Sequence, residues 1–170
     1  MTLNSMELEN PSFNAATEEH VVVFRLAAES YALDIQRVQE IVRMQTITSI
    51  PGVDAWVEGI TNLRGRVVPV MDLRRRCGIP VCEYTSDSRI VVVSSENGMV
   101  GLVVDAVSEV MRIPAGMVEL PGGIVSAPEN AYVRGIAKLD DRLIALVDLN
   151  ALLPVSISVT ADDVQVESAA

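Results

Sequence analysis

Short apolar runs, separated by turn residues, recur along most of the chain. The first runs from Val21 to Leu26, and a second from Tyr31 to Ile35. Short segments that are rich in β-branched and aromatic residues predict strands. Apolar residues also stand three apart from Val38 onward, which fits a helix, but 38–42 fits a strand as well. Periodicity over so short a segment leaves both interpretations open.

Glycine and polar capping residues divide the middle of the chain into short elements. Asp54–Glu58 predicts a single helical turn. Residues 60–71 predict a β-hairpin with Arg64-Gly65 at its tip, because two apolar runs flank this turn signal. Asp72 can accept hydrogen bonds from the first backbone amides of a helix, so we expect a short helix that runs through Arg76.

The second half of the chain repeats this succession of elements. Residues 88–105 predict one hairpin, and 132–149 predict another around Asp140-Asp141. Prolines and glycines punctuate 114–128 between them, which predicts irregular structure there.

The two halves also match residue by residue. When 32–43 is aligned with 101–112, Glu40 meets Glu109 and Arg43 meets Arg112. Further matches continue the alignment: Leu33 with Leu102, Val38 with Val107, Ile41 with Val110, Gly59 with Gly135, Leu63 with Leu139, Arg66 with Arg142, and Asp72 with Asp148. A repeat of about 70 residues with about five strands is the size of a small β-barrel. Chance similarity between two apolar β segments is the alternative.

Composition and charge narrow the functions that such a chain can serve. Apolar residues make up 49% and charged residues 21%, as in globular proteins. No apolar run approaches the roughly 20 residues of a membrane span, and no secretory signal is evident, so a cytoplasmic protein is expected. The net charge of −10 disfavours nucleic acids and anionic membrane surfaces as partners.

Candidate groups for chemistry are few. His20 is the only histidine, and no nucleophile motif accompanies it, so acid–base or triad catalysis is not expected. Cys77 and Cys82 cannot complete a four-ligand zinc site. A disulfide between them is disfavoured in the cytoplasm, which predicts two thiols at a partly buried turn. Gly122-Gly123 lacks the Lys-Ser/Thr of a phosphate loop. We expect no enzyme activity, no cofactor and no metal.

Four segments resemble the signature segments of the CheW-like domain family. They occur in the family's order and are Val38–Ile41, Gly59–Gly65, Val68–Arg74 and Gly101–Val107. The resemblance covers 20–154. In one departure, Val42 follows the first segment where the family often has arginine, and Arg43 stands one place later.

The resemblance implies an all-β fold with short helices, in which two SH3-like five-stranded β-barrels pack over a shared core. We expect this domain at 20–154, with elements of 20–35 and 88–154 exchanging against 36–87. A flexible arm is expected at 1–19 and a tail of uncertain order at 155–170.

The resemblance also implies a function. Members of the family are non-enzymatic adaptors that couple the cytoplasmic tips of chemoreceptors to the regulatory domain of the histidine kinase CheA. We expect a monomer that joins a ring or array in complex, recruited from the cytoplasm to membrane-associated receptors without membrane insertion. Coupling in a non-chemotactic pathway, such as surface motility or biofilm signalling, is an alternative. A nucleic-acid-binding barrel is a distant one, since aromatic residues for base stacking make up only 4%.

The expected protein-binding residues carry over by position in the signature segments. They are Val38, Glu40, Gly59, Asn62, Arg64, Gly65, Gly101, Val107 and Val110. For the three valines, core packing is the alternative to a groove that binds the apolar face of a receptor helix.

An ion pair between Glu40 and Arg64 is one hypothesis about this surface. Arg64, Arg66 and Arg74–Arg76 gather basic residues in one segment of an acidic chain. This segment is interpreted either as a solvated face or as a surface complementary to an acidic partner, and both remain open.

Overall fold

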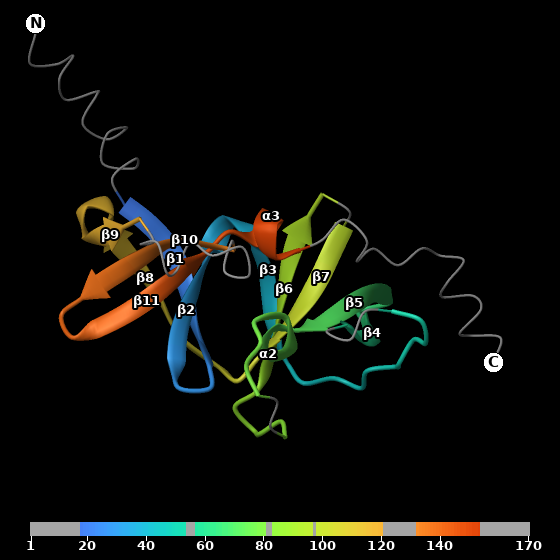
Figure 1. Cartoon of the computed structure of the whole chain (residues 1–170). Helices are drawn as coiled ribbons and strands as arrows, with labels where there is room; N and C mark the ends of the chain where they lie inside the picture. Colours follow the sequence, from blue (N-terminus) through green and yellow to red (C-terminus); the bar gives the residue numbers. More distant parts are fainter. Residues whose placement is uncertain (1–17, 54–56, 81–82, 97, 121–131, 154–170) are drawn as a thin grey trace, which may run out of the picture.

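The computed structural model describes residues 18–53, 57–80, 83–96, 98–120 and 132–153 (Figure 1). Strands dominate this part of the chain, as the sequence predicts. The strands are β1 (Glu18–Leu26), β2 (Glu29–Asp34), β3 (Val38–Arg43), β4 (Val57–Leu63), β5 (Arg66–Asp72), β6 (Arg89–Ser95), β7 (Gly98–Val104), β8 (Ala106–Pro114), β9 (Val118–Glu119), β10 (Val133–Leu139) and β11 (Arg142–Val147). The helical elements are η1 (Ile35–Arg37), α2 (Leu73–Arg76), η2 (Ala115–Met117) and α3 (Leu149–Leu152).

The strands form two sheets that lie side by side (Figure 1). One has the order β8-β1-β2-β11-β10-β9, and the other has the order β3-β6-β7-β5-β4. Each curls back on itself: β9, which follows β8, pairs with β10, and Thr48, which follows β3, pairs with Ile60 of β4. We call the first barrel 1 and the second barrel 2. Because β9 has only two residues, each barrel has five longer strands, as expected.

The two barrels exchange strands. The β1–β2 hairpin lies in barrel 1, but β3, β4 and β5, which follow it, lie in barrel 2. In the second half, the β6–β7 hairpin lies in barrel 2, and β8 to β11 lie in barrel 1. The chain therefore returns to barrel 1 at Asp105 and not at residue 88. Parallel pairing of β5 with β7, through Val70 and Gly101, holds the β6–β7 hairpin in barrel 2.

Strand registers support the alignment of the two halves. Along β3, Val38 and Glu40 are opposite adjacent residues of β6, so Gln39 is an extra residue. Along β8, Val107 and Glu109 are opposite adjacent residues of β1 in the same way. One inserted residue of this kind is a β-bulge, which bends the strand locally. The bulge occurs at matched positions in both halves.

The predictions of local structure are confirmed where hydrogen bonds connect residues close in the sequence. The Asp72 side chain accepts from the Arg74 backbone amide at 2.9 Å, so it caps α2 as predicted. At the β4–β5 hairpin tip, Arg64 and Gly65 have φ of 56° and 83°, the left-handed conformation that a two-residue hairpin turn requires. Residues 38–43 form a strand, which settles the choice left open by their periodicity.

Some predictions of local structure are wrong, because strand pairing determines the structure at those positions. Val57 and Glu58 begin β4 instead of ending a helical turn, because Val57 pairs with Met71. Residues 54–56 lie outside the described residues. Glu18 and Glu19, expected in the arm, pair with β8 as part of β1, and 1–17 lie outside the described residues.

Pairing with β1 also extends β8 through Pro114, and η2 and β9 follow where irregular structure was expected. Residues 121–131 and the tail 154–170 lie outside the described residues.

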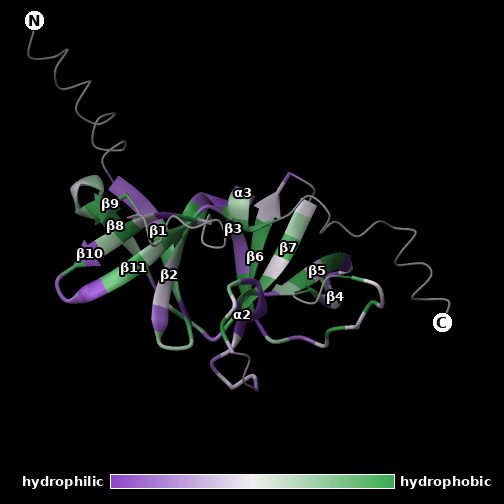
Figure 2. Cartoon of the chain, in the orientation of Figure 1, coloured by the Kyte–Doolittle hydropathy of each residue, from purple (hydrophilic) through white to green (hydrophobic). Residues whose placement is uncertain are grey.

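Apolar side chains form a cluster inside each barrel and a third between the barrels. The third combines Phe24 and Leu33 of barrel 1 with Met71 and Leu102 of barrel 2, all at most 1% exposed. Figure 2 shows hydrophobic residues along the strands and hydrophilic residues at the tip of the β10–β11 hairpin. The shared core that the sequence predicts is therefore present.

Candidate protein-binding surface

Glu40 and Arg64 form the ion pair that the sequence suggested. Arg64 Nη2 lies 3.3 Å from Glu40 Oε1, with the Arg64 side chain 82% exposed and that of Glu40 27% exposed. The hairpin tip is held by Asn62, whose Oδ1 accepts from the Gly65 backbone amide at 2.9 Å. The pair joins β3 to the tip of the β4–β5 hairpin, so it fixes a charged feature on the surface of barrel 2.

Barrel 1 carries a second pair at the matched position. Arg142 Nη1 lies 3.0 Å from Glu109 Oε2, and both side chains are 43% exposed. Glu109 is the repeat partner of Glu40, but its arginine comes from the start of β11 and not from a hairpin tip. The local sequence around Glu109 and Arg142 does not predict this pair. The repeat alignment contained the signal, since it matched both Glu109 and Arg142.

Exposed apolar side chains occur at positions that match between the two halves, on β3 and β5 of barrel 2 and on β8 and β11 of barrel 1. Val110 is the repeat partner of Ile41, and both are exposed. Val67 and Leu143, each one residue after the arginine that begins its strand, are exposed as well. Contiguous apolar patches with polar rims mark protein-binding surfaces, and these side chains provide exposed apolar area on each barrel.

The three candidate valines have different environments. Val38 and Val107 are half-buried and pack against the cluster between the barrels. Val110 is 51% exposed. The side chains of Val38 and Val107 therefore contact mainly the core, whereas the side chain of Val110 is accessible to a partner.

Each of the three candidate glycines disfavours a side chain, through a close contact or a positive φ. Gly59 has φ of 149°, and a Cβ there would lie 2.0 Å from the Thr48 carbonyl oxygen. A Cβ on Gly101 would lie 2.8 Å from Ile90 Cγ2. Gly65 has open space around it but a left-handed φ. These three positions shape the strands and the hairpin tip that present the charged residues.

Arg74 is buried, although its position among other arginines predicts an exposed side chain. Its side chain is 2% exposed, with Nη2 3.2 Å from Asp72 Oδ2 and Nη1 3.2 Å from Asp105 Oδ1. Its guanidinium also lies 5.0 Å from the centre of the Tyr84 ring. A buried guanidinium requires such partners, because an unpaired charge in the protein interior is strongly destabilising.

The other two arginines of α2 also contact residues elsewhere in the protein. Arg75 Nε lies 3.5 Å from Glu58 Oε1. Arg76 Nε donates to the Leu152 carbonyl of α3 at 2.9 Å. The side chains of Arg74 and Arg76 bind other residues of this protein. They therefore form neither a solvated face nor a surface for an acidic partner.

Burial raises the pKa values of protonated groups near α2. It raises the pKa of Tyr84 to about 12, and the charges of Asp72 and Glu58 act in the same direction. Burial also raises the pKa of the half-buried Cys77 thiol, so this thiol stays protonated and poorly nucleophilic at neutral pH. Cys82 lies outside the described residues.

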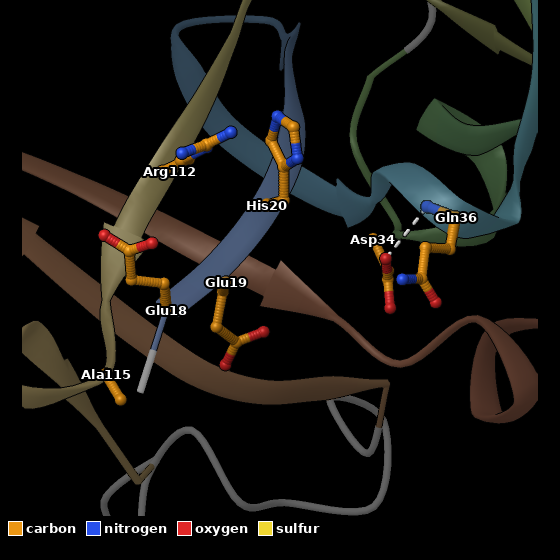
Figure 3. Close-up of a pocket in the computed structure, with 7 residues that line it drawn as sticks. All are labelled: Glu18, Glu19, His20, Asp34, Gln36, Arg112 and Ala115. Carbon is orange, nitrogen blue, oxygen red and sulfur yellow. Dashed lines mark hydrogen bonds between the residues drawn. The ribbon is translucent and has the colours of Figure 1, made fainter. Parts of the chain in front are cut away.

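A polar hollow of about 590 Å³ lies on barrel 1 beside η1 (Figure 3). It is lined by Glu18, Glu19, His20, Asp34, Gln36, Arg112 and Ala115. Glu19 is bound on both oxygens by Arg134, at 2.6 and 2.9 Å. The Asp34 side chain accepts from the Gln36 backbone amide at 2.9 Å. The lining therefore combines acidic and basic side chains with one amide.

The described ranges contain neither a metal-binding cluster nor a membrane-spanning helix. No group of three or more histidine, cysteine or acidic side chains is arranged there to hold a metal ion. None of the helices in the same ranges is long and apolar enough to span a membrane.

Comparison with known proteins gives a consistent family. Residues 20–156 match the family model of the CheW-like domain. Chemotaxis protein CheW of Bacillus subtilis is 33% identical over 137 residues, which cover 81% of this chain and 88% of that protein. Protein PilI of Pseudomonas aeruginosa is 32% identical over 91 residues, 54% of this chain and 51% of that protein.

A solved structure shares the fold. The crystal structure of the scaffolding protein TtCheW from Thermoanaerobacter tengcongensis aligns with a TM-score of 0.75 at 41% sequence identity, covering 84% of this chain and 97% of that one. Together with the match over 20–156, this shows that the chain belongs to the CheW-like domain family.

Proposed function

We propose that this protein is a non-enzymatic adaptor that couples chemoreceptors to a histidine kinase of the CheA type. One observation carries the proposal: each barrel presents its own exposed Glu–Arg pair and its own exposed apolar side chains. One chain of the CheW-like family thus offers two separate surfaces, which is what bridging two proteins requires. The partners are the cytoplasmic tip of a receptor and the regulatory domain of the kinase.

The expected binding residues divide into three roles in this proposal. The exposed side chains of Glu40, Asn62, Arg64 and Val110 contact partners directly. The exposed parts of the half-buried Val38 and Val107 receive the apolar face of a receptor helix. The glycines Gly59, Gly65 and Gly101 act through the backbone shape of these surfaces.

The proposed adaptor is a monomer alone and a ring or array member in complex, recruited from the cytoplasm to the receptors. It regulates the kinase by binding one kinase state more tightly than the other, because equal affinity for all states would shift no equilibrium.

Reconstitution with receptor and kinase tests the proposal. The wild-type protein is expected to bind the kinase regulatory domain with a Kd below about 100 µM and to raise receptor-dependent autophosphorylation. Arg64→Glu and Glu40→Arg should each weaken coupling about tenfold or more, because each places like charges together. The double reversal should restore much of it. Lys138→Glu, at an exposed pair within barrel 1, is the matched control.

Two results would contradict the proposal. One is a folded wild-type protein that binds neither partner at this concentration. The other is a pair of single reversals that leave coupling as strong as in the Lys138→Glu control.

A second candidate is the same adaptor role in a pathway that does not control swimming. The similarity to Protein PilI favours it, because that name, unlike the name of the Bacillus relative, does not refer to chemotaxis. Deletion of the gene in its native cell separates the two. Loss of swimming bias supports the first role, and loss of surface motility or biofilm signalling with normal swimming bias supports the second.

A further inference from the structure

The chain passes between the barrels at two points within the described residues, and a charged side chain marks each. The first crossing is η1, between β2 of barrel 1 and β3 of barrel 2. The second is Asp105, between β7 of barrel 2 and β8 of barrel 1. Arg37 ends η1, and Asp105 is itself the second crossing, so both are placed to contact the two barrels at once.

Asp105 binds both barrels with its two carboxylate oxygens. Its Oδ2 accepts from the Ala27 backbone amide at 2.6 Å, at the tip of the β1–β2 hairpin of barrel 1. Its Oδ1 accepts from Arg74 Nη1 at 3.2 Å, and Arg74 is anchored in barrel 2 by Asp72. A continuous series of charge-assisted hydrogen bonds therefore joins the hairpin of one barrel to α2 of the other.

Arg37 makes the corresponding bridge at the first crossing. Its Nε and Nη2 donate to the Ser94 carbonyl of β6 in barrel 2, at 3.2 and 2.9 Å. The same Nη2 donates to Asn150 Oδ1 of α3, which follows barrel 1, at 3.2 Å. A planar guanidinium can hold two acceptors in fixed directions, which a lysine ammonium does less well.

These bridges do something that the apolar core between the barrels cannot. Burial of apolar area is non-directional, so it favours contact between the barrels without defining the direction of individual contacts. Hydrogen bonds from a guanidinium or to a carboxylate weaken steeply when their angle changes. An element that fixes orientation should therefore be polar and should contact both barrels, as Asp105 and Arg37 do.

We propose that Asp105 and Arg37 are crossover clamps that set the angle between the two barrels, with Arg74 as the positioning residue for Asp105. The Glu40–Arg64 pair lies on barrel 2 and the Glu109–Arg142 pair lies on barrel 1. The clamps therefore set how these two surfaces are presented relative to each other. This functional consequence rests on the proposed adaptor role, but the clamp itself does not.

Orientation can be measured on the isolated full-length protein by residual dipolar couplings of backbone amides, fitted separately for each barrel. The wild type should give one common alignment tensor. Asp105→Ala combined with Arg37→Gln should give two different tensors, with chemical shifts inside each barrel unchanged. Asp105→Asn, which keeps one acceptor oxygen, should fall between them. Lys138→Gln, which removes an exposed ion pair to Glu119 within barrel 1, should keep the common tensor.

A second measurement covers the case in which the double variant fails to fold. Hydrogen exchange of the Ala27 amide should become about tenfold faster or more in Asp105→Ala alone, because this amide loses a charged acceptor. Exchange inside β10 and β11 should not change. A folded double variant with one common tensor, or an unchanged Ala27 exchange rate, would overturn the clamp.

The consequence for coupling is tested with each partner separately and with both together. Asp105→Ala should bind receptor and kinase individually as the wild type does and should lose kinase activation in the three-component assembly. If the adaptor role is wrong, the wild type fails these binding assays too, while the dipolar couplings still decide the clamp. Normal activation by a variant with two tensors would overturn the link between barrel angle and coupling.

Discussion

The two barrels share a framework, but they differ in the short helix that follows β5 in barrel 2 and β11 in barrel 1. In barrel 2, Asp72 caps α2 and is itself fully buried against Arg74. In barrel 1, Asp148 caps α3 through the backbone amides of Asn150 and Ala151, with no arginine in α3. The same backbone role is thus retained in both halves, while only α2 adds arginines, which contact Asp105 and Leu152. Repetition preserves what the fold needs, and the differences show where the two halves have specialised.

The matched glycines provide the largest expected difference between the barrels. Gly59→Ala should destabilise the protein by more than about 4 kcal/mol, because the new Cβ would meet the backbone of Thr48 and φ is unfavourable. Gly135→Ala should destabilise it by about 1–3 kcal/mol, because its nearest atom belongs to the Val118 side chain, which can move. Urea unfolding followed by circular dichroism measures both. Equal losses would show that the two sites are equally rigid.

Removal of the two helix caps should have the next largest effect. Asp72→Ala should cost about 3–5 kcal/mol, because it removes a partner of the buried Arg74 guanidinium as well as a cap. Asp148→Ala should cost about 1 kcal/mol, the usual value of an N-cap. The same unfolding assay tests the pair. A loss at Asp72 no larger than that at Asp148 would mean that Arg74 finds sufficient compensation from Asp105.

Stability should also fall at alkaline pH, by a smaller and pH-dependent amount. Burial raises the pKa values of Tyr31, Cys77, Tyr84 and Tyr132, and that of Tyr84 rises to about 12. A raised pKa in the folded state means that the unfolded chain releases its proton first. The contribution of Tyr84 is therefore complete below about pH 10 and is lost as pH rises through 12.

Variants can assign this alkaline loss to a barrel. Tyr84→Phe and Tyr132→Phe should each flatten the decline of unfolding free energy between pH 9 and 12, measured by urea titration at each pH. A decline that is unchanged in both variants would place its origin in other groups.

Local signals explain how far the sequence could predict this fold. The Arg64-Gly65 tip and the Asp72 cap were predictable, because their hydrogen bonds connect residues two or three apart. The Glu40–Arg64 pair followed from family resemblance. The start of β4 at Val57 was not predictable, because it depends on pairing with Met71. Val57 and Met71 pair at the open end of the β4–β5 hairpin, far from its Arg64-Gly65 tip, and this pairing leaves no periodic trace in the local sequence.

The arginine-rich segment shows the same limit at the site. Arg74 pairs with Asp105, 31 residues away, and Arg76 donates to Leu152, 76 residues away. Clustered arginines are ordinarily solvated. Arg74 and Arg76 instead contact residues that only the folded chain, with its exchanged strands, brings next to α2. The repeat alignment identified Glu109 and Arg142 separately, yet their pairing required the closed barrel.

The smallest effect should come from the two exposed ion pairs, where the comparison between barrels is most sensitive. Double-mutant cycles with Glu40→Gln and Arg64→Gln, and with Glu109→Gln and Arg142→Gln, measure each pair's coupling energy. Both should be about 0–1 kcal/mol, since their arginines are largely or partly exposed. The Glu109–Arg142 energy should be the larger, because Arg142 lies at the start of a strand, whereas Arg64 is 82% exposed at a hairpin tip. Both should shrink in 1 M salt. A coupling energy above about 2 kcal/mol at Glu40–Arg64 would contradict this expectation. It would indicate that the pair stabilises the fold in addition to presenting charges to partners.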